Sequence, residues 1–240
     1  MDKNNNPKLH AFMAACGIGS RRKCEEYIDI GRVTVNGRLV LKQGLRVSPE
    51  DKITYNGKRI YSTSKKIYIA VNKPKNYLCS SFDPYNRPLL INLFKDIFPF
   101  RLHNVGRLDF LSTGLIFFTN DGEFTRTITH PGFRMEKEYV VETKKKIDIK
   151  NLESFKKGIY INNIKYKIKS YRLKNPVTVN LVFEEGKNRE IRNFFIRFNN
   201  EPRRVHRIRI GNITLKKILP GQFRRLNDKE VNWFLKWSRK

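Results

Sequence analysis

The sequence predicts an α+β protein with two unequal domains. Helical spacing followed by alternating residues opens the chain, and a polar segment of serines, threonine and lysines interrupts the pattern at residues 62–66. The strands predicted after that segment are interrupted by helices rather than alternating with them, which argues against a doubly wound parallel sheet. We therefore place a small helical and β domain at residues 8–61 and a larger one at residues 66–240.

Two short helices are predicted at the start of the first domain. Leu9, Phe12 and Met13 recur at helical spacing and indicate the first helix. Ser20 is placed to cap the second helix, which ends near Gly31.

The second helix carries Arg21, Arg22 and Lys23 in its first turn. Cations there oppose the helix macrodipole by roughly 0.3 to 1 kcal/mol each. With the free N–H groups of that helix end, they could form a phosphate-binding surface, to which we also assign Arg32. A solvated basic face is the alternative.

Alternating residues follow in RVTVNGRLV, where Asn36 and Gly37 indicate a hairpin turn. A further alternating run passes through Val47, Ile53 and Tyr55. Two helices followed by a small sheet, with basic residues on the second helix, resemble the RNA-binding domain first described in ribosomal protein S-four. This resemblance implies that residues 8 to about 57 bind RNA.

The second domain has a mixed pattern in which strands predominate. Strands are predicted at residues 67–71, 115–119, 138–143, 165–173, 178–183 and 204–210. Helices are predicted at residues 149–157 and 189–198 and at the end of the chain. In the last helix Asn227 and Glu230 are spaced as a capping box, and Leu226 and Val231 as a hydrophobic staple.

The charge of the chain is its most unusual bulk property. Fifty Lys and Arg against 22 Asp and Glu among 240 residues give a net charge of +28. Such a surplus attracts polyanions, although part of it is open to explanation as a compositional bias toward Lys, Asn and Ile. Paired arginines suited to phosphate contact are Arg21 with Arg22, Arg203 with Arg204, Arg207 with Arg209, and Arg224 with Arg225.

Several classes of site and location are not indicated. The chain has no run of about 18 apolar residues and no signal-peptide pattern, so we expect a cytoplasmic protein that does not enter the membrane. Three cysteines without CxxC spacing and four scattered histidines do not indicate a disulfide framework or a metal site. Without a Walker or dinucleotide-binding glycine motif, we expect chemistry that needs no cofactor.

The segment NVGRLDFLSTGLIFFTNDG, residues 104–122, is the most informative part of the chain. It places Asp109 between Arg107 and a strand-like apolar run at residues 115–119. An acid at the end of an element can be aimed into a cleft by a rigid scaffold. A turn or helix-capping aspartate is the structural alternative, and spacing alone does not decide between them.

This segment resembles the signature of the RsuA/RluB family of ribosomal RNA pseudouridine synthases. Further matches occur in family order, and together they cover roughly residues 66 to 226. They are NKP at 72–74, HP at 130–131, KEYVV at 137–141 and EGKNREIRNFF at 185–195. The resemblance implies a mixed, largely antiparallel catalytic domain with an active-site cleft across the middle of its sheet.

The resemblance also implies the catalytic residues. Asp109 matches the family's catalytic aspartate, acting as a nucleophile or as a base. Arg107 or, in preference, Arg192, which matches the family's active-site arginine, could keep it ionised, since a nearby opposite charge favours the charged form. Tyr139 matches the tyrosine of the family's site, where its ring can stack on the uracil and its hydroxyl can transfer a proton. An ordinary strand aromatic is the alternative for Tyr139.

A uridine inside a helical stack cannot be reached, so the target should be flipped into the cleft. Polar and basic residues in the matching motifs would offset the cost of flipping, although each one alone is equally compatible with a solvated surface charge. The residues assigned to RNA binding in this domain are Lys73, Arg107, Asn188, Arg189, Arg204 and Arg207.

The chain departs from the family pattern at four asparagines. Asn76, Asn199 and Asn200 stand where glycine is usual, and Asn193 stands where arginine is common. Asparagine at position 76 tolerates positive φ, so this departure is compatible with the family's backbone. The other changes bear on the RNA contacts and leave the catalytic assignment intact.

The wording of NREIR, with the attached N-terminal domain, resembles the RluB-like branch that acts on large-subunit rRNA. We therefore expect ribosomal RNA or an assembly intermediate as partner, and a monomeric enzyme. A non-catalytic RNA-binding or ribosome-assembly protein and a DNA-binding protein are the alternatives. The target uridine is not encoded in any recognisable motif.

Overall fold

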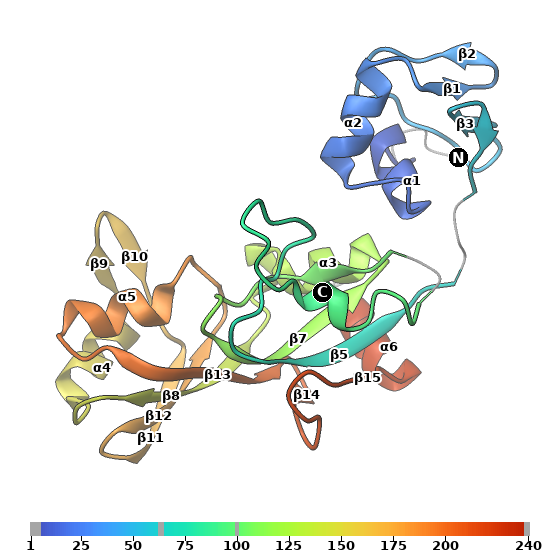
Figure 1. Ribbon diagram of the computed structural model, residues 1–240. Coiled ribbons are helices and arrows are strands. Elements are labelled where there is room, and N and C mark those ends of the chain that lie inside the picture. Colours follow the sequence, from blue (N-terminus) through green and yellow to red (C-terminus); the bar gives the residue numbers. More distant parts are fainter. Residues whose placement is uncertain (1–5, 62–64, 99–100, 238–240) are drawn as a thin grey trace. The chain divides into compact units, whose positions relative to one another are not determined.

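The structure is a computed structural model that describes residues 6–61, 65–98 and 101–237. The chain divides between Lys66 and Ile67 into two compact units (Figure 1). The predicted linker at 62–66 falls partly on residues 62–64, which lie outside the described ranges. Within those ranges, no helix is both long and apolar enough to span a bilayer.

The first unit has two helices followed by an antiparallel sheet of order β2-β1-β3-β4. Its elements are α1 (Leu9–Ala15), α2 (Arg21–Asp29), β1 (Val33–Val35), β2 (Arg38–Leu39), β3 (Ile53–Tyr55) and β4 (Lys58–Arg59). The backbone N–H of Lys23 donates to the Ser20 hydroxyl at 3.2 Å, which confirms the predicted helix cap. Leu9, Met13 and Ile28 contribute to the core of this unit.

The second unit is built on a nine-stranded sheet of order β11-β12-β8-β13-β7-β5-β15, with β14 paired to β13 and β6 to β7. Its pairings are antiparallel except for the parallel contact between β13 and β7, as predicted for a largely antiparallel domain. The strands are β5 (Tyr68–Lys73), β6 (His103–Val105), β7 (Thr113–Thr119), β8 (Lys137–Thr143), β11 (Ser170–Asn175), β12 (Thr178–Phe183), β13 (Pro202–Ile210), β14 (Ile213–Thr214) and β15 (Phe223–Arg225).

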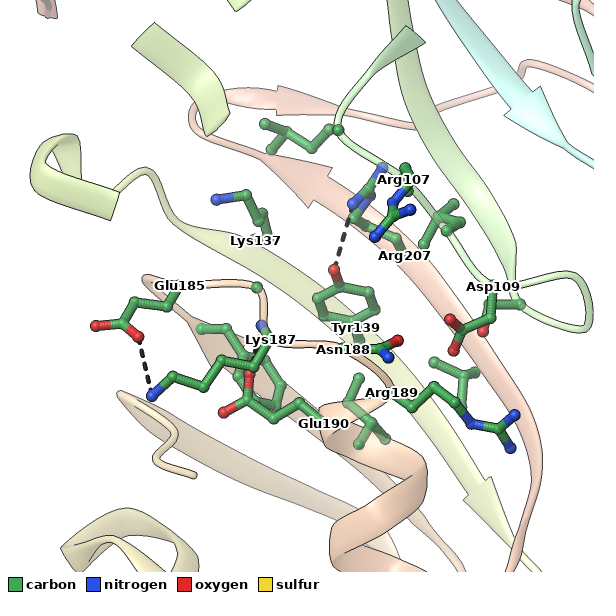
Figure 2. Close-up of a pocket in the computed structure, with 18 of the residues that line it drawn as sticks. Arg107, Asp109, Lys137, Tyr139, Glu185, Lys187, Asn188, Arg189, Glu190 and Arg207 are labelled. Carbon is green, nitrogen blue, oxygen red and sulfur yellow. Dashed lines mark hydrogen bonds and ion pairs between the residues drawn. The ribbon is translucent and has the colours of Figure 1, made fainter. Parts of the chain in front are cut away.

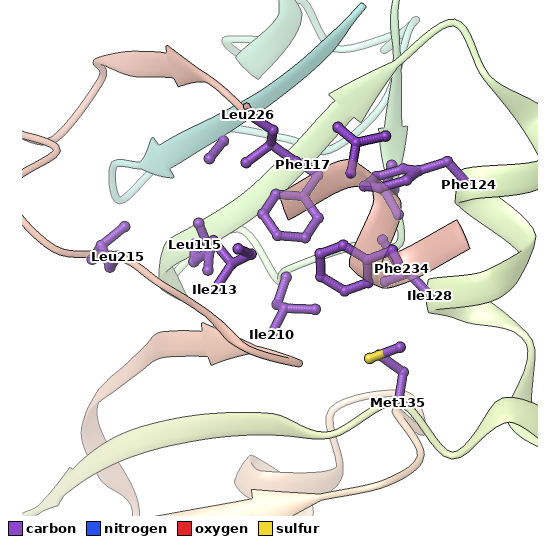
Figure 3. Close-up of a cluster of buried hydrophobic side chains, with 13 residues drawn as sticks. Leu115, Phe117, Phe124, Ile128, Met135, Ile210, Ile213, Leu215, Leu226 and Phe234 are labelled. Atoms are coloured by element: carbon purple, nitrogen blue, oxygen red, sulfur yellow. The ribbon is translucent and has the colours of Figure 1, made fainter. Parts of the chain in front are cut away.

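Helices cover the two halves of this sheet separately. They are α3 (Gly122–Thr129), α4 (Ile149–Lys157), α5 (Glu190–Arg197) and α6 (Asp228–Trp237), with 3-10 turns η2 (Leu90–Leu93) and η3 (Pro131–Phe133). Figure 3 shows Phe124 of α3 and Phe234 of α6 packed with Phe117 of β7. A second cluster joins α4 and α5 to β8 and β12. The partly buried Tyr139 borders that second cluster and a third one beside β5 and β7.

One predicted strand is wrong and several short elements were missed. Residues 165–173 do not form one strand, because β10 (Ile164–Tyr166) pairs in a hairpin with β9 (Ile159–Ile161), whereas β11 joins the large sheet. Ile168, in the segment that connects β10 to β11, is fully buried. The predicted capping box is confirmed: Asn227 Oδ1 accepts from the N–H of Glu230 at 2.9 Å, and Glu230 accepts from that of Asn227 at 3.0 Å.

Candidate active site

A cleft of about 270 Å³ lies over the middle strands of the large sheet (Figure 2). Most of its lining comes from the loop between β6 and β7, strand β8, residues 185–192 around the start of α5, and strand β13, with smaller contributions from α3 and β12. Segments remote in the sequence therefore meet at one site.

The loop that carries Asp109 is fixed by a buried lysine at the end of β5. The Nζ of Lys73 donates to the carbonyls of Pro74 at 3.0 Å, Phe110 at 3.2 Å and Ser112 at 2.7 Å. The N–H of Ser112 also donates to the carbonyl of Asp109 at 3.0 Å. These bonds hold the backbone from Asp109 to Ser112.

The prediction that Lys73 contacts RNA is wrong, because its side chain has no exposed surface. Burial lowers its pKa to about 8, while the neighbouring Asp109 and Cys79 raise it. A charge enclosed in this way is retained where hydrogen bonds compensate for its desolvation. Lys73 therefore stabilises the Asp109 loop through hydrogen bonds to its backbone.

Asp109 faces a buried arginine across the cleft. The Asp109 Oδ2 lies 3.9 Å from Nε of Arg192, and the side chains are 37% and 7% exposed. In the part of the chain that the structure describes, Arg192 Nε has no hydrogen-bond partner. Burial lowers the pKa of Arg192 and the carboxylate of Asp109 raises it. The expected proximity of Asp109 and Arg192 is therefore present, at ion-pair distance.

Glu190 orders the segment that leads into α5. Its buried carboxylate accepts from the backbone N–H of Lys187 at 3.1 Å and of Lys167 at 3.3 Å. Burial raises its pKa, and these two N–H groups lower it. Arg189, with φ 49°, and Asn188 are thereby presented at the rim, where both are exposed.

Tyr139 on β8 forms part of one wall. Its ring packs edge-to-face on Phe183, with centroids 5.7 Å apart, and its hydroxyl oxygen accepts from Nη1 of Arg207 at 3.3 Å. Arg207 is 3% exposed, and its Nε donates to the carbonyl of Leu115 at 2.5 Å. Arg207 therefore lies in the wall of the cleft and supports Tyr139.

The glycine after the GRLD segment is explained by the parallel contact between β7 and β13. A Cβ on Gly114 would lie 2.2 Å from the carbonyl oxygen of Arg207, and its φ is 105°. The neighbouring Thr113 hydroxyl is hydrogen-bonded to His206 Nδ1 at 2.7 Å. No other residue type fits at position 114 without separating the two strands.

The remaining predicted residues are divided between the two units. Arg107 lines the cleft and is exposed, whereas Arg204 does not line it and pairs with Glu142 at 3.0 Å. In the first unit, the exposed residues assigned to RNA binding are Arg21, Arg22, Lys23 and Arg32. Of these, Lys23 pairs with Glu26 at 2.6 Å, which reduces its free charge.

Sequence reasoning missed Lys137 as a cleft residue. It lines the cleft two residues before Tyr139 on β8, and its Nζ donates to the carbonyl of Met135 at 2.8 Å. Burial and the nearby Arg207 lower its pKa to about 8, whereas Glu185 raises it. The signal was available, because residues 137 and 139 of a strand share one face.

The departures from the family pattern have local explanations. Asn76 and Asn199 adopt φ of 65° and 53°, the region that asparagine tolerates. Asn193 donates to the Tyr166 hydroxyl at 3.1 Å, and Asn200 Oδ1 accepts from the N–H of Lys145 at 3.0 Å. Within residues 6–61, 65–98 and 101–237, no group of three or more His, Cys, Asp or Glu side chains is arranged to hold a metal ion.

Comparison with known proteins agrees with this geometry. Residues 67–209, more than half of the chain, match the family described as RNA pseudouridylate synthase. The chain belongs to this family. Residues 8–53 match the S4 domain. The protein is a pseudouridine synthase of the RsuA/RluB type, with an S4 domain in its first unit.

Relatives of this synthase align with nearly its whole length. A protein of Borreliella burgdorferi named "Uncharacterized RNA pseudouridine synthase" is 44% identical, over 94% of this chain and 92% of its own. The ribosomal large subunit pseudouridine synthase B of Bacillus subtilis is 31% identical, over 93% of each chain. The ribosomal small subunit pseudouridine synthase A of Escherichia coli is 34% identical, over 93% of this chain and 98% of its own.

The synthase also resembles a solved structure described as a pseudouridylate synthase. The TM-score is 0.69 and the sequences are 27% identical, with 95% of this chain and 99% of the other covered. The similarity to this structure therefore agrees with the mixed, largely antiparallel fold that the motifs predicted for this chain.

Proposed function

We propose that this synthase converts one uridine of ribosomal RNA to pseudouridine, with the large subunit as its source and Asp109 as the catalytic carboxylate. The observation that carries the proposal is the pairing of a partly exposed Asp109 with the buried Arg192 in one cleft. Relatives named for large-subunit and small-subunit RNA both match the chain. The NREIR wording favours the large subunit. We further propose that the enzyme acts as a cytoplasmic monomer.

The reaction is an isomerisation, so every atom of the substrate is retained. The bond between N1 of uracil and C1′ of ribose breaks, the base turns, and its C5 bonds to C1′. The proton on C5 is lost to a base, and N1 gains a proton. Asp109 begins this sequence either as a nucleophile toward C1′ or as a base toward the neighbouring ribose carbon. In both roles the carboxylate reacts beside the cation of Arg192, whose Nε lies 3.9 Å away.

Tyr139 is proposed to hold the flipped base. Its ring faces the cleft between the β6–β7 loop and β13, so it offers a stacking surface for uracil. Its hydroxyl is fixed by Arg207 and can carry a proton to or from the base. Flipping costs a few kcal/mol, which contacts from exposed rim residues such as Arg107 and Arg189 would offset.

Pseudouridine mapping on protein-free large-subunit and small-subunit RNA tests this proposal. The wild type should introduce a new mark on large-subunit RNA, and Asp109→Asn should remove it while RNA affinity stays within about threefold, because amide and carboxylate are nearly isosteric. Marking of small-subunit RNA alone would reverse the assignment of the substrate. Tight binding without a mark on either RNA or on assembling particles would favour a non-catalytic RNA-binding protein.

A further inference from the structure

Two cations line the cleft beside Tyr139, and the proposed mechanism gives neither a direct contact with the base. Lys137 lies on β8 and Arg207 on β13. Figure 2 shows Tyr139 between Asp109 on one side and Lys137 on the other, with Arg207 above the tyrosine hydroxyl. A base stacked on Tyr139 with its sugar at Asp109 would direct its outer edge toward these cations.

One N–H donor group of Arg207 has no acceptor among the described residues. Its Nε is bonded to Leu115 and its Nη1 to Tyr139, but its buried Nη2 has no hydrogen-bond partner among the described residues. An unsatisfied buried donor costs roughly 1 to 3 kcal/mol, and more when it is charged. Since Arg207 lines the cleft, a ligand acceptor there would satisfy it.

Lys137 also has donor capacity to spare. An ammonium group has three N–H donors, and the bond to Met135 uses one. The charged groups that line the cleft around it are Arg207 on β13, Arg107 in the β6–β7 loop, and Glu185 and Lys187 before α5. Lys187 is paired with Glu185 at 3.1 Å, so the carboxylate of Glu185 does not neutralise Lys137 alone.

The chemistry of the substrate calls for donors at this place. When the N1–C1′ bond breaks, its electron pair stays on uracil, and resonance spreads the negative charge to the oxygens on C2 and C4. A donor aimed at such an oxygen binds the anion more strongly than the neutral base and so accelerates the step. Cytosine carries an amino group on C4 in place of the oxygen. That amino group is itself a donor, so it could not accept a hydrogen bond from a cation at this place.

We propose that Lys137 and Arg207 form a donor pair that binds the two carbonyl oxygens of the flipped uracil and stabilises the uracil anion. This inference rests on the proposed function. It assigns uracil recognition to the part of the cleft wall formed by β8 and β13, and it makes Lys137 a catalytic residue.

The test uses a short synthetic RNA that carries the mapped uridine, measured by single-turnover kinetics with the full-length protein. Lys137→Met should lower the rate about 100-fold with RNA affinity within about threefold, as for loss of one oxyanion donor, and Lys137→Arg should retain most of the rate. Lys174→Met, at an exposed position on β11, is the matched control. Equal losses in Lys137→Met and Lys137→Arg would indicate a merely structural role and would overturn the donor pair.

Sulfur in place of either oxygen identifies the contact without altering the fold. Because sulfur is a weaker acceptor, RNA with 2-thiouridine or 4-thiouridine should react more slowly with wild type, and one of these penalties should vanish in Lys137→Met. Undiminished rates on both analogues would overturn the pair. Since Arg207 supports Tyr139 and Leu115, its replacement is a less secure test than these substrates.

The pH profile gives a further readout. Because the pKa of Lys137 is about 8, the wild-type rate should fall as pH rises through that value, and Lys137→Arg should move the fall to higher pH. An unmoved profile would count against the pair. No pseudouridine with wild type would overturn the proposed function, and this inference with it, whereas full activity of Lys137→Met would overturn the donor pair alone.

Discussion

Cations in the two units of this synthase are placed in opposite ways. Those of the first unit, such as Arg21 and Arg22 at the start of α2, are exposed. Beside the exposed rim cations of the second unit, three cations next to the cleft are almost fully enclosed, with whole-residue exposed fractions of 0% for Lys73, 6% for Arg192 and 3% for Arg207. A net charge of +28 therefore describes two different populations of side chains.

The difference separates affinity from chemistry. Exposed cations exchange their counterions for phosphates and give binding that depends strongly on salt. Enclosed cations cost several kcal/mol to desolvate, so a fold keeps them where hydrogen bonds or function compensate. We expect changes in the second population to affect rate and stability, and changes in the first to affect binding.

The largest effect is expected for Lys73→Met. The methionine fills a similar volume but donates no hydrogen bonds, so the carbonyls of Phe110 and Ser112 in the Asp109 loop, and that of Pro74, lose this donor. Displacement of a catalytic group by about 1 Å costs about 100-fold, and we expect single-turnover rates to fall 100- to 1,000-fold. Lys75→Met, at an exposed position two residues away, should react like wild type.

The same variant tests the electrostatic cost of burial. The pKa of Lys73 falls from 10.5 to about 8 in the folded protein, so between these values the unfolded chain binds more protons and stability rises with pH. Wild type should gain roughly 3 kcal/mol across this window relative to Lys73→Met. Urea unfolding at pH 8 and pH 10.5 measures the difference. A constant gap between the two proteins would contradict a charged, buried Lys73.

A somewhat smaller loss is expected for Arg192→Gln. Without the guanidinium, Asp109 loses the cation that lies 3.9 Å from its carboxylate in the cleft. We expect a rate about 100-fold below wild type, with RNA affinity within about threefold. Arg197→Gln, exposed at the other end of α5, is the control. Weaker RNA binding with an unchanged rate at saturating enzyme would show that Arg192 contributes to affinity and not to the chemical step.

The sequence predicted features set by local spacing better than the burial of the enclosed cations. The cap at Ser20 and the motif around Asp109 depend on local spacing, which a single sequence displays. Lys73 is buried because carbonyl groups of the Asp109 loop accept its hydrogen bonds. That loop is remote in the sequence, so the sequence alone indicates an ordinary surface lysine. The break near Ile168 was hidden for the same reason, because alternation continues while the chain passes between two sheets.

The smallest effect is expected for the double change Arg21→Gln and Arg22→Gln in the first unit. Each phosphate contact contributes about one unit to the slope of log affinity against log salt concentration. The slope should therefore fall by up to about 2, and affinity at moderate salt should drop roughly tenfold. The single-turnover rate at saturating enzyme should stay at the wild-type value, because the cleft lies wholly in the second unit. Arg38→Gln, exposed on β2, serves as a comparison that removes one charge elsewhere in the same unit. A reduced rate with an unchanged salt slope would show that these exposed arginines act on the chemical step, and the separation between the two populations of cations would then fail.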